Sequence, residues 1–140
     1  MVKILLCCGG GFSSSVLANA IKKGIIDNKL EKNFSIEFLP IDLGMQRMSD
    51  YNIMICCPHL LYNAKKIINN ATASIPIYFL PPKMYGAVDF KELALDIEDI
   101  LEIYKKTKTN PVHFPGEENT MTIPRFISYR NYNKLKQNSL

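Results

Sequence analysis

The sequence has no run of apolar residues that approaches the ~20 needed to cross a bilayer, although 47% of its residues are hydrophobic. Its N-terminal segment contains a single Lys3 and one short apolar run, which is typical of a core strand and unlike a secretory signal. A length of 140 residues suffices for one domain with a core and is too short for two. We therefore expect a globular chain that stays in the cytoplasm, where it is made.

The sequence also lacks a disulfide framework. Its four cysteines occur as two adjacent pairs, Cys7-Cys8 and Cys56-Cys57, and each pair lies where a buried strand is expected to end. We expect these thiols to be reduced, as in cytosolic proteins. Together with His59 they could bind zinc, but adjacent cysteines lack the ligand spacing of structural zinc sites. We therefore predict no metal and no cofactor.

An excess of basic residues is confined to the C-terminal segment. Residues 105–140 contain seven Lys or Arg against two Glu, whereas residues 1–104 contain ten basic and eleven acidic side chains. The body of the chain therefore lacks the positive charge that nucleic-acid binding requires. The C-terminal segment also contains aromatic residues, which polar linkers lack. It could fold back on the body, dock on a partner or lie on a membrane surface.

Short apolar runs alternate with segments of helical periodicity. The apolar runs predict strands at residues 2–7, 35–39, 52–57 and 75–80, and the helical spacing predicts helices that begin near Ser13, Leu60 and Asp89. Asp89 is a good N-cap, and Glu92 three residues later indicates a capping box. This alternation predicts an α/β fold, an open and mostly parallel four-stranded sheet flanked by helices. We place the domain at residues 1–106 and a basic, aromatic-containing extension at residues 107–140.

The first predicted strand runs into a segment suited to phosphate. After Cys8 come Gly9, Gly10, Gly11, Phe12, Ser13, Ser14 and Ser15. Function in such sheets collects at the carboxyl ends of the strands. Glycine N–H groups can form a nest for an anion, the following helix directs its positive end to the same place, and serine hydroxyls can donate to phosphate oxygens. The same donors should lower the pKa of a cysteine at the mouth of the nest, so its thiolate would be an activated nucleophile.

Three interpretations of this segment compete. Both cysteines could be plain core residues; because adjacent strand residues face opposite sides, we assign Cys7 to the core and Cys8 to chemistry. A low-molecular-weight tyrosine phosphatase would carry an arginine in this loop, but its position is taken by Ser14 and the loop has no arginine. A phosphoryl carrier needs such a neutral, phosphatase-like cysteine loop, because it must hold phosphate without accelerating attack by water.

Three segments carry a further pattern. Cys8, Gly11, Phe12 and the serines match Cys-x-x-Gly-Met-Ser-Thr-Ser, with Phe12 in place of Met. Residues 52–62 consist of an apolar run followed by a proline and a tyrosine. Residues 84–89 contain a Tyr-Gly pair shortly before the last predicted helix. In these segments the chain resembles the lactose/cellobiose-type IIB components of sugar phosphotransferase systems. The resemblance covers about residues 1–105 and implies the sheet order 2-1-3-4.

The resemblance also implies a function. Cys8 would accept a phosphoryl group from a phosphohistidine of a IIA protein, held by the loop at residues 9–15. It would pass this group to a sugar, expected to be a β-linked disaccharide, in a membrane-embedded IIC permease. The protein would be a cytoplasmic phosphotransferase that meets the membrane only through IIC.

Two positions depart from the family pattern. The family's usual Gly and Gln around the proline are Cys57 and His59 here. His59 could lie on the rim of the site, where its charge near neutral pH could assist or disturb transfer, or it could be a solvent-facing loop residue. Two other functions stay open at this point: a phosphatase-like hydrolase, and a degenerate IIB-like module that regulates another protein.

Overall fold

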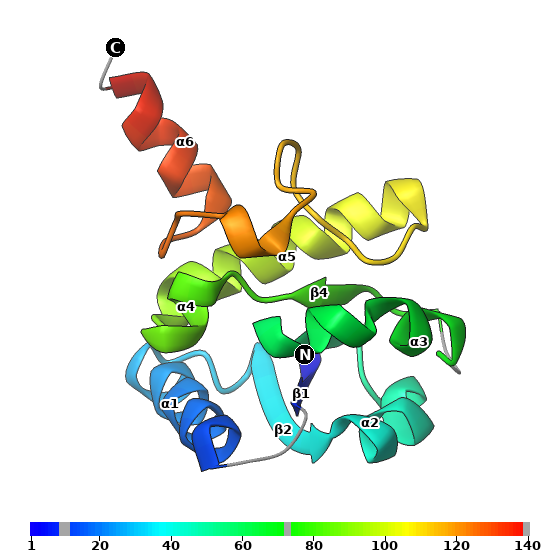
Figure 1. The fold of residues 1–140 in the computed structure, drawn as a ribbon. Coiled ribbons are helices and arrows are strands. Elements are labelled where there is room, and N and C mark those ends of the chain that lie inside the picture. The colour runs from blue at the N-terminus through cyan, green and yellow to red at the C-terminus, as the bar shows by residue number, and fades with distance from the viewer. Residues whose placement is uncertain (9–11, 72–73, 139–140) are drawn as a thin grey trace.

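The computed structural model describes residues 1–8, 12–71 and 74–138 (Figure 1). Its strands are β1 (Val2–Cys8), β2 (Phe34–Pro40), β3 (Ile53–Cys56) and β4 (Ile77–Phe79). They form a four-stranded sheet in the order β2-β1-β3-β4, and every neighbouring pair is parallel. The predicted α/β fold and its strand order are therefore confirmed.

Helices cover both faces of the sheet. The longer ones, α1 (Phe12–Asp27) and α5 (Phe90–Thr107), share an apolar core with one face. The other face packs against α2 (Ile41–Arg47), α3 (Ala64–Asn69) and the 3-10 turns Met48–Asp50 and Pro58–Asn63. The remaining elements are α4 (Pro82–Gly86), the 3-10 turn Thr120–Thr122 and α6 (Tyr129–Asn138). The strands β3 and β4 and most of β1 are thus buried on both sides, which explains their nearly unbroken apolar sequences, whereas β2 at the edge is only partly buried.

The short helices α2 and α4 were not predicted. Pro40 directly precedes α2, and Pro82 begins α4. Proline suits the first turn of a helix, where its missing N–H has no partner to lose. The helix predicted from Leu60 begins later, at Ala64, because residues 58–63 form a 3-10 turn.

The start of α5 differs in part from the prediction. Asp89 caps the helix as predicted and accepts a hydrogen bond from the Lys91 N–H at 3.0 Å. The predicted capping box is wrong, because the Glu92 carboxylate binds the C-terminal extension. It accepts hydrogen bonds from the N–H and hydroxyl of Ser128 and from the side-chain amide of Asn131. Burial alone would raise the pKa of Glu92, but these hydrogen bonds lower it.

The extension folds back on the body, one of the three alternatives left open by its composition. Its first part covers the edge of β4: the Asn110 side chain accepts from the Ile77 N–H at 2.8 Å, and the Val112 N–H donates to the Ile77 carbonyl at 2.9 Å. Phe114 is buried and stacks on Tyr129, with ring centroids 4.5 Å apart. Beyond these contacts, α6 leads away from the body (Figure 1). A sheet edge covered in this way is protected from pairing with other chains.

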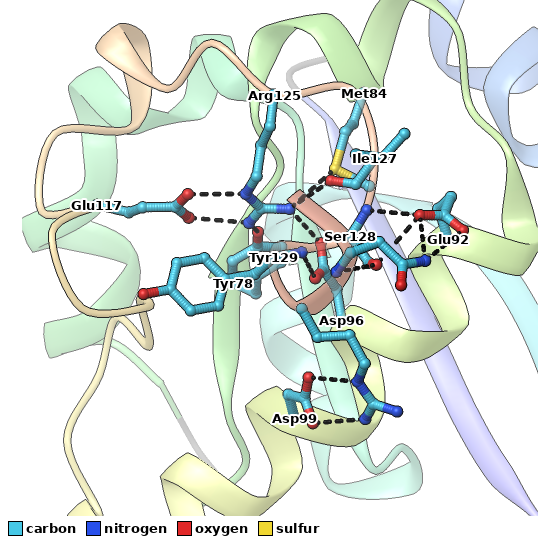
Figure 2. Close-up of polar contacts among 12 residues, drawn as sticks. Tyr78, Met84, Glu92, Asp96, Asp99, Glu117, Arg125, Ile127, Ser128 and Tyr129 are labelled. Carbon is cyan, nitrogen blue, oxygen red and sulfur yellow. Dashed lines mark hydrogen bonds and ion pairs between the residues drawn. The ribbon is translucent and has the colours of Figure 1, made fainter. Parts of the chain in front are cut away.

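Arg125 holds this extension to the body (Figure 2). Its buried guanidinium donates to Asp96 of α5 at 2.7 Å and to the Tyr78 hydroxyl of β4 at 3.0 Å. It also donates two hydrogen bonds to Glu117 of the extension, at 2.7 and 2.8 Å. Asp96 accepts a further bond from the Tyr129 N–H at 2.8 Å. One cation therefore joins two carboxylates and two elements of the body.

The charges of this network depend on one another. Burial alone would lower the pKa of Arg125, but its hydrogen bonds to Glu117 and the charge of Asp96 raise it. Burial raises the pKa of Asp96 to about 6, against the opposing effect of Arg125. Asp96 therefore depends on Arg125 to stay ionised in the interior.

We predict that Arg125→Met lowers the free energy of unfolding by about 3–5 kcal/mol, because it leaves a buried carboxylate without its partner. Chemical denaturation measures this loss. Arg130→Met is the matched control: Arg130 also binds a carboxylate, that of Asp99, but its side chain is 40% exposed. The control should lose no more than about 1 kcal/mol. Equal losses for the two variants would contradict the role of Arg125.

The same variant should acquire a characteristic pH dependence. Without Arg125, the pKa of Asp96 in the folded protein lies above about 6, and therefore above its ordinary value in the unfolded chain. The folded state then favours the protonated form, so this contribution to stability is full below the ordinary pKa and is lost as the pH rises through the folded value. We expect Arg125→Met to recover part of its stability in acid relative to the wild type. Denaturation curves at several pH values measure this; a pH-independent loss would contradict it.

Candidate functional site

Cys8 ends β1 at the centre of the sheet. The chain leaves β1 towards β2 on one side, while β3 lies on the other, so the strand order reverses between β1 and β3. This switch point, at the carboxyl ends of the strands, is where ligands bind in open α/β sheets. The 16-residue helix α1 begins at Phe12, shortly after Cys8. The candidate nucleophile therefore lies at the position that the fold favours for a site.

The predicted phosphate loop falls on residues that the structure does not describe. Gly9, Gly10 and Gly11 lie outside the described residues, and of residues 12–15 only the helical backbone is described. A loop that binds phosphate, and a lowered pKa of the Cys8 thiol, therefore stay predictions.

Cys8 is joined to Cys57 by a disulfide, so the prediction of reduced thiols is wrong for this pair. The cause is the register of the two inner strands. Cys7 lies opposite Cys56, and the next residues, Cys8 and Cys57, are neighbours whose Cα atoms are 5.4 Å apart. This separation is normal for a disulfide. Adjacent cysteines along the chain make a poor disulfide framework, and the bond between the two strands was not predicted.

Cys7 and Cys56 face the opposite side of the sheet and remain free thiols. Both are fully buried in the core beneath α2 and α3, which confirms the assignment of Cys7 to the core. Burial raises the pKa of Cys7 to about 12 and that of Cys56 well above its ordinary value. These two thiols are therefore poor nucleophiles, because the reactive thiolate is disfavoured.

His59 lies two residues beyond Cys57, at the carboxyl end of β3, and is exposed. Its ring meets the edge of Tyr85 in α4, with centroids 5.2 Å apart. This contact links the segments that follow β3 and β4, on the edge of the sheet where Cys8 lies. A role of His59 in chemistry stays a prediction.

The three arginines of the chain are each engaged by carboxylates of other elements. Arg47 contacts Glu37 and Asp50 near the surface. Arg125 and Arg130 bind carboxylates of α5 and of the extension. The positive charge that a phosphatase needs beside its cysteine is thus committed elsewhere.

The open hollow at the opposite end of the sheet is a separate feature. It has a volume of about 570 Å³, and its lining includes Lys3, Glu37, Arg47 and Tyr51. Its polar groups are partnered: the Tyr51 hydroxyl donates to Glu37, which also contacts Arg47. Burial and this hydrogen bond raise the pKa of Tyr51 to about 12. The hollow lies at the amino ends of β1 and β2 and shares no residue with the Cys8 site.

In the part of the chain that the structure describes, no group of three or more His, Cys, Asp or Glu side chains is arranged to hold a metal ion. No helix of the same residues has the length and apolar character to cross a membrane.

Two comparisons point to the same group of proteins. The profile of the PTS system, Lactose/Cellobiose specific IIB subunit, matches residues 3–96. The structure is also similar to the lactose-specific IIB component domain of the phosphoenolpyruvate:carbohydrate phosphotransferase system from Streptococcus pneumoniae, with 21% sequence identity and a TM-score of 0.53. That match covers 69% of this chain and 95% of the pneumococcal one, and at this identity it shows a shared fold. No curated protein matches the chain significantly.

We predict that Cys7→Ser lowers the free energy of unfolding by about 1–3 kcal/mol, because it places a hydroxyl in an apolar core. Cys7→Ala, which introduces no polar group, should be the milder change. Urea denaturation compares the two variants, and non-reducing mass spectrometry tests whether Cys8 and Cys57 stay bonded in both. A serine variant as stable as the wild type would contradict the burial of Cys7.

Proposed function

The chain belongs to the lactose/cellobiose-specific IIB family of the sugar phosphotransferase system, and from this we propose that Cys8, in its reduced form, carries a phosphoryl group between two partners. The donor is a phosphohistidine of a IIA protein. The acceptor is a sugar, a β-linked disaccharide, bound in a membrane-embedded IIC permease. The carrier works in the cytoplasm and meets the membrane through IIC.

The proposed transfer has two balanced steps. The Cys8 thiolate attacks phosphorus, an S–P bond forms, and the P–N bond to the IIA histidine breaks as its imidazole leaves. A sugar hydroxyl then attacks the same phosphorus, the S–P bond breaks, the thiolate is regenerated and the hydroxyl proton passes to water. No cofactor takes part, since the thiolate is both nucleophile and leaving group.

The observation that carries this proposal is the position of Cys8. It ends β1 at the switch point of the sheet, and α1 begins at Phe12. The N-terminus of a long helix favours nearby negative charge, both on a thiolate and on a phosphoryl group. Residues 9–15 are proposed to hold the phosphoryl oxygens, with His59 on the rim.

The contacts of the arginines with carboxylates support a carrier function over a hydrolase function. A phosphatase stabilises the charge that develops when water attacks its phosphocysteine, commonly with an arginine. Here Arg47, Arg125 and Arg130 all contact carboxylates of other elements. The phosphocysteine would therefore persist until a sugar hydroxyl arrives.

The extension at residues 107–140 is proposed to stabilise the carrier without taking part in transfer. Residues 1–106 contain Cys8, its loop and His59, whereas the contacts of Arg125 are to β4, α4, α5 and the extension itself. Under conditions where it stays folded, Arg125→Met should thus accept phosphate as the wild type does.

The central experiment is intact-mass measurement of the reduced protein after incubation with phosphorylated IIA. We expect one phosphoryl group, located on Cys8 by peptide mapping, and none on sulfur in Cys8→Ser. Cys7→Ser is the matched control and should still accept phosphate, because its neighbour on β1 is intact.

Three results would contradict the proposal. Phosphate on Cys7 or on a serine would refute the assignment of the nucleophile. Brisk turnover of aryl phosphates that disappears in Cys8→Ser would favour a hydrolase. A folded, reduced protein that accepts no phosphate from IIA would favour a regulatory IIB-like module.

A further inference from the structure

The disulfide between Cys8 and Cys57 occupies the sulfur on which the proposed function depends. Both residues belong to the core shared with α1 and α5, and their side chains are at most 1% exposed. A sulfur bonded to another sulfur has no thiolate with which to attack phosphorus. The bonded protein therefore cannot form an S–P bond at this position.

The bond is selective within a set of four cysteines. β1 ends in Cys7 and Cys8, and β3 ends in Cys56 with Cys57 directly after it, so one pair of cysteines lies on each face of the sheet. The pair beneath α2 and α3, Cys7 and Cys56, stays unbonded, although its register is equivalent. Burial raises the pKa of both of these thiols and keeps them in the unreactive form. The bonded pair is therefore the one on the face of the proposed nucleophile, towards α1 and α5.

We propose that Cys57 is a redox partner of Cys8, and that oxidation by hydrogen peroxide joins the two and reversibly switches off phosphoryl transfer. This inference rests on the proposed function, since it concerns the same sulfur. It adds the regulation of the site and assigns a role to a cysteine that stands where the family usually has glycine.

Oxidation of the two cysteines to the disulfide proceeds in two steps. The Cys8 thiolate attacks one oxygen of hydrogen peroxide, which yields a sulfenic acid on Cys8 and releases hydroxide. The Cys57 thiol then attacks the Cys8 sulfur, the S–S bond forms, and the sulfenic hydroxyl leaves as water with the thiol proton. Two electrons pass from the cysteines to the peroxide. A dithiol reverses the reaction by exchange and is itself left as a disulfide.

The proposed function places the first attack at Cys8, although this residue is only 1% exposed in the bonded form. A sulfur that a IIA histidine must reach in the reduced protein can also be reached by peroxide, which is much smaller. Cys57 follows β3 directly, and its N–H donates to the Cys7 carbonyl at 3.1 Å, so its backbone is already fixed beside β1. This arrangement holds the Cα atoms of Cys8 and Cys57 5.4 Å apart, a separation that suits a disulfide. Rapid closure also keeps the sulfenic acid from oxidising further to the irreversible sulfinic acid.

The test exposes the full-length protein to hydrogen peroxide and then to dithiothreitol. Thiols are counted by alkylation of the denatured protein before and after reduction, a readout that does not depend on phosphoryl transfer. Acceptance of phosphate from phosphorylated IIA is measured on the same samples. The variants are Cys57→Ala and the matched control Cys56→Ala, which removes the neighbouring sulfur that faces the other side. Cys57→Ser is measured alongside, so that a folding defect of one variant does not decide the result.

We expect the wild type and the variants to differ in their thiol counts and in the recovery of phosphate acceptance. Peroxide-treated wild type shows two alkylatable thiols before reduction and four afterwards, as Cys7 and Cys56 stay free. It accepts no phosphate until dithiothreitol restores it fully. Cys56→Ala, which has three cysteines, shows one alkylatable thiol before reduction and three afterwards, and dithiothreitol restores it in the same way. The Cys57 variants form no Cys8 bond, gain oxygen on Cys8 with continued exposure, and are not fully restored by dithiothreitol.

Other outcomes overturn the inference. If the bonded wild type still accepts phosphate, or if the Cys57 variants recover as completely as the wild type, the switch is refuted while the proposed function stands. If the reduced wild type accepts no phosphate, the proposed function fails and the switch fails with it. The thiol count then still shows whether Cys8 and Cys57 pair.

Discussion

The parallel register of β1 against β3 determines what lies at the functional edge of this molecule. Because Cys7 is opposite Cys56, one pair of sulfurs is directed beneath α2 and α3 and the next pair towards α1 and α5. A shift of one residue would exchange these faces. It would direct Cys8 beneath α2 and α3. The apolar packing that fixes the register therefore also fixes the face of the sheet on which the Cys8 sulfur lies.

A second constraint acts at the other side of the sheet, where the C-terminal extension covers β4. The extension brings its own cation into the interior, and Arg125 is satisfied only when Asp96, Glu117 and the Tyr78 hydroxyl are all in place. A guanidinium has donors in a fixed planar arrangement, so few other packings can satisfy it. The network thus specifies one position for the extension more than it adds net stability.

The sequence predicted most of the fold and only part of the site. Apolar runs bounded by glycine and proline located the strands, and the N-cap at Asp89 located α5, because these signals are local. The short helices after Pro40 and Pro81 were missed, since a proline that ends a strand and one that begins a helix look alike in sequence. Glu92 was assigned to a capping box because its partners, Ser128 and Asn131, are distant along the chain.

The difference between local signals and contacts of distant residues also explains which predictions about the cysteines were right. Alternation along one strand is a local property, so the core position of Cys7 could be predicted. The bond of Cys8 to Cys57 depends on which residues of two strands lie side by side, and adjacent cysteines within each strand gave no sign of it. Arg125 was missed for a similar reason: a basic residue in a basic segment resembles a solvated one until its buried carboxylates are known.

The bond between Cys8 and Cys57 also changes the unfolded chain. It joins residues 49 positions apart, which restricts the freedom of everything between them. In the chain-entropy account, closing a loop of this length disfavours the unfolded state by about 4 kcal/mol. The bonded protein should therefore resist heat and proteolysis better than the thiol form. The thiol form, which is the form proposed to carry phosphate, would then have the lower free energy of unfolding. The oxidised protein would be the longer-lived of the two until it is reduced.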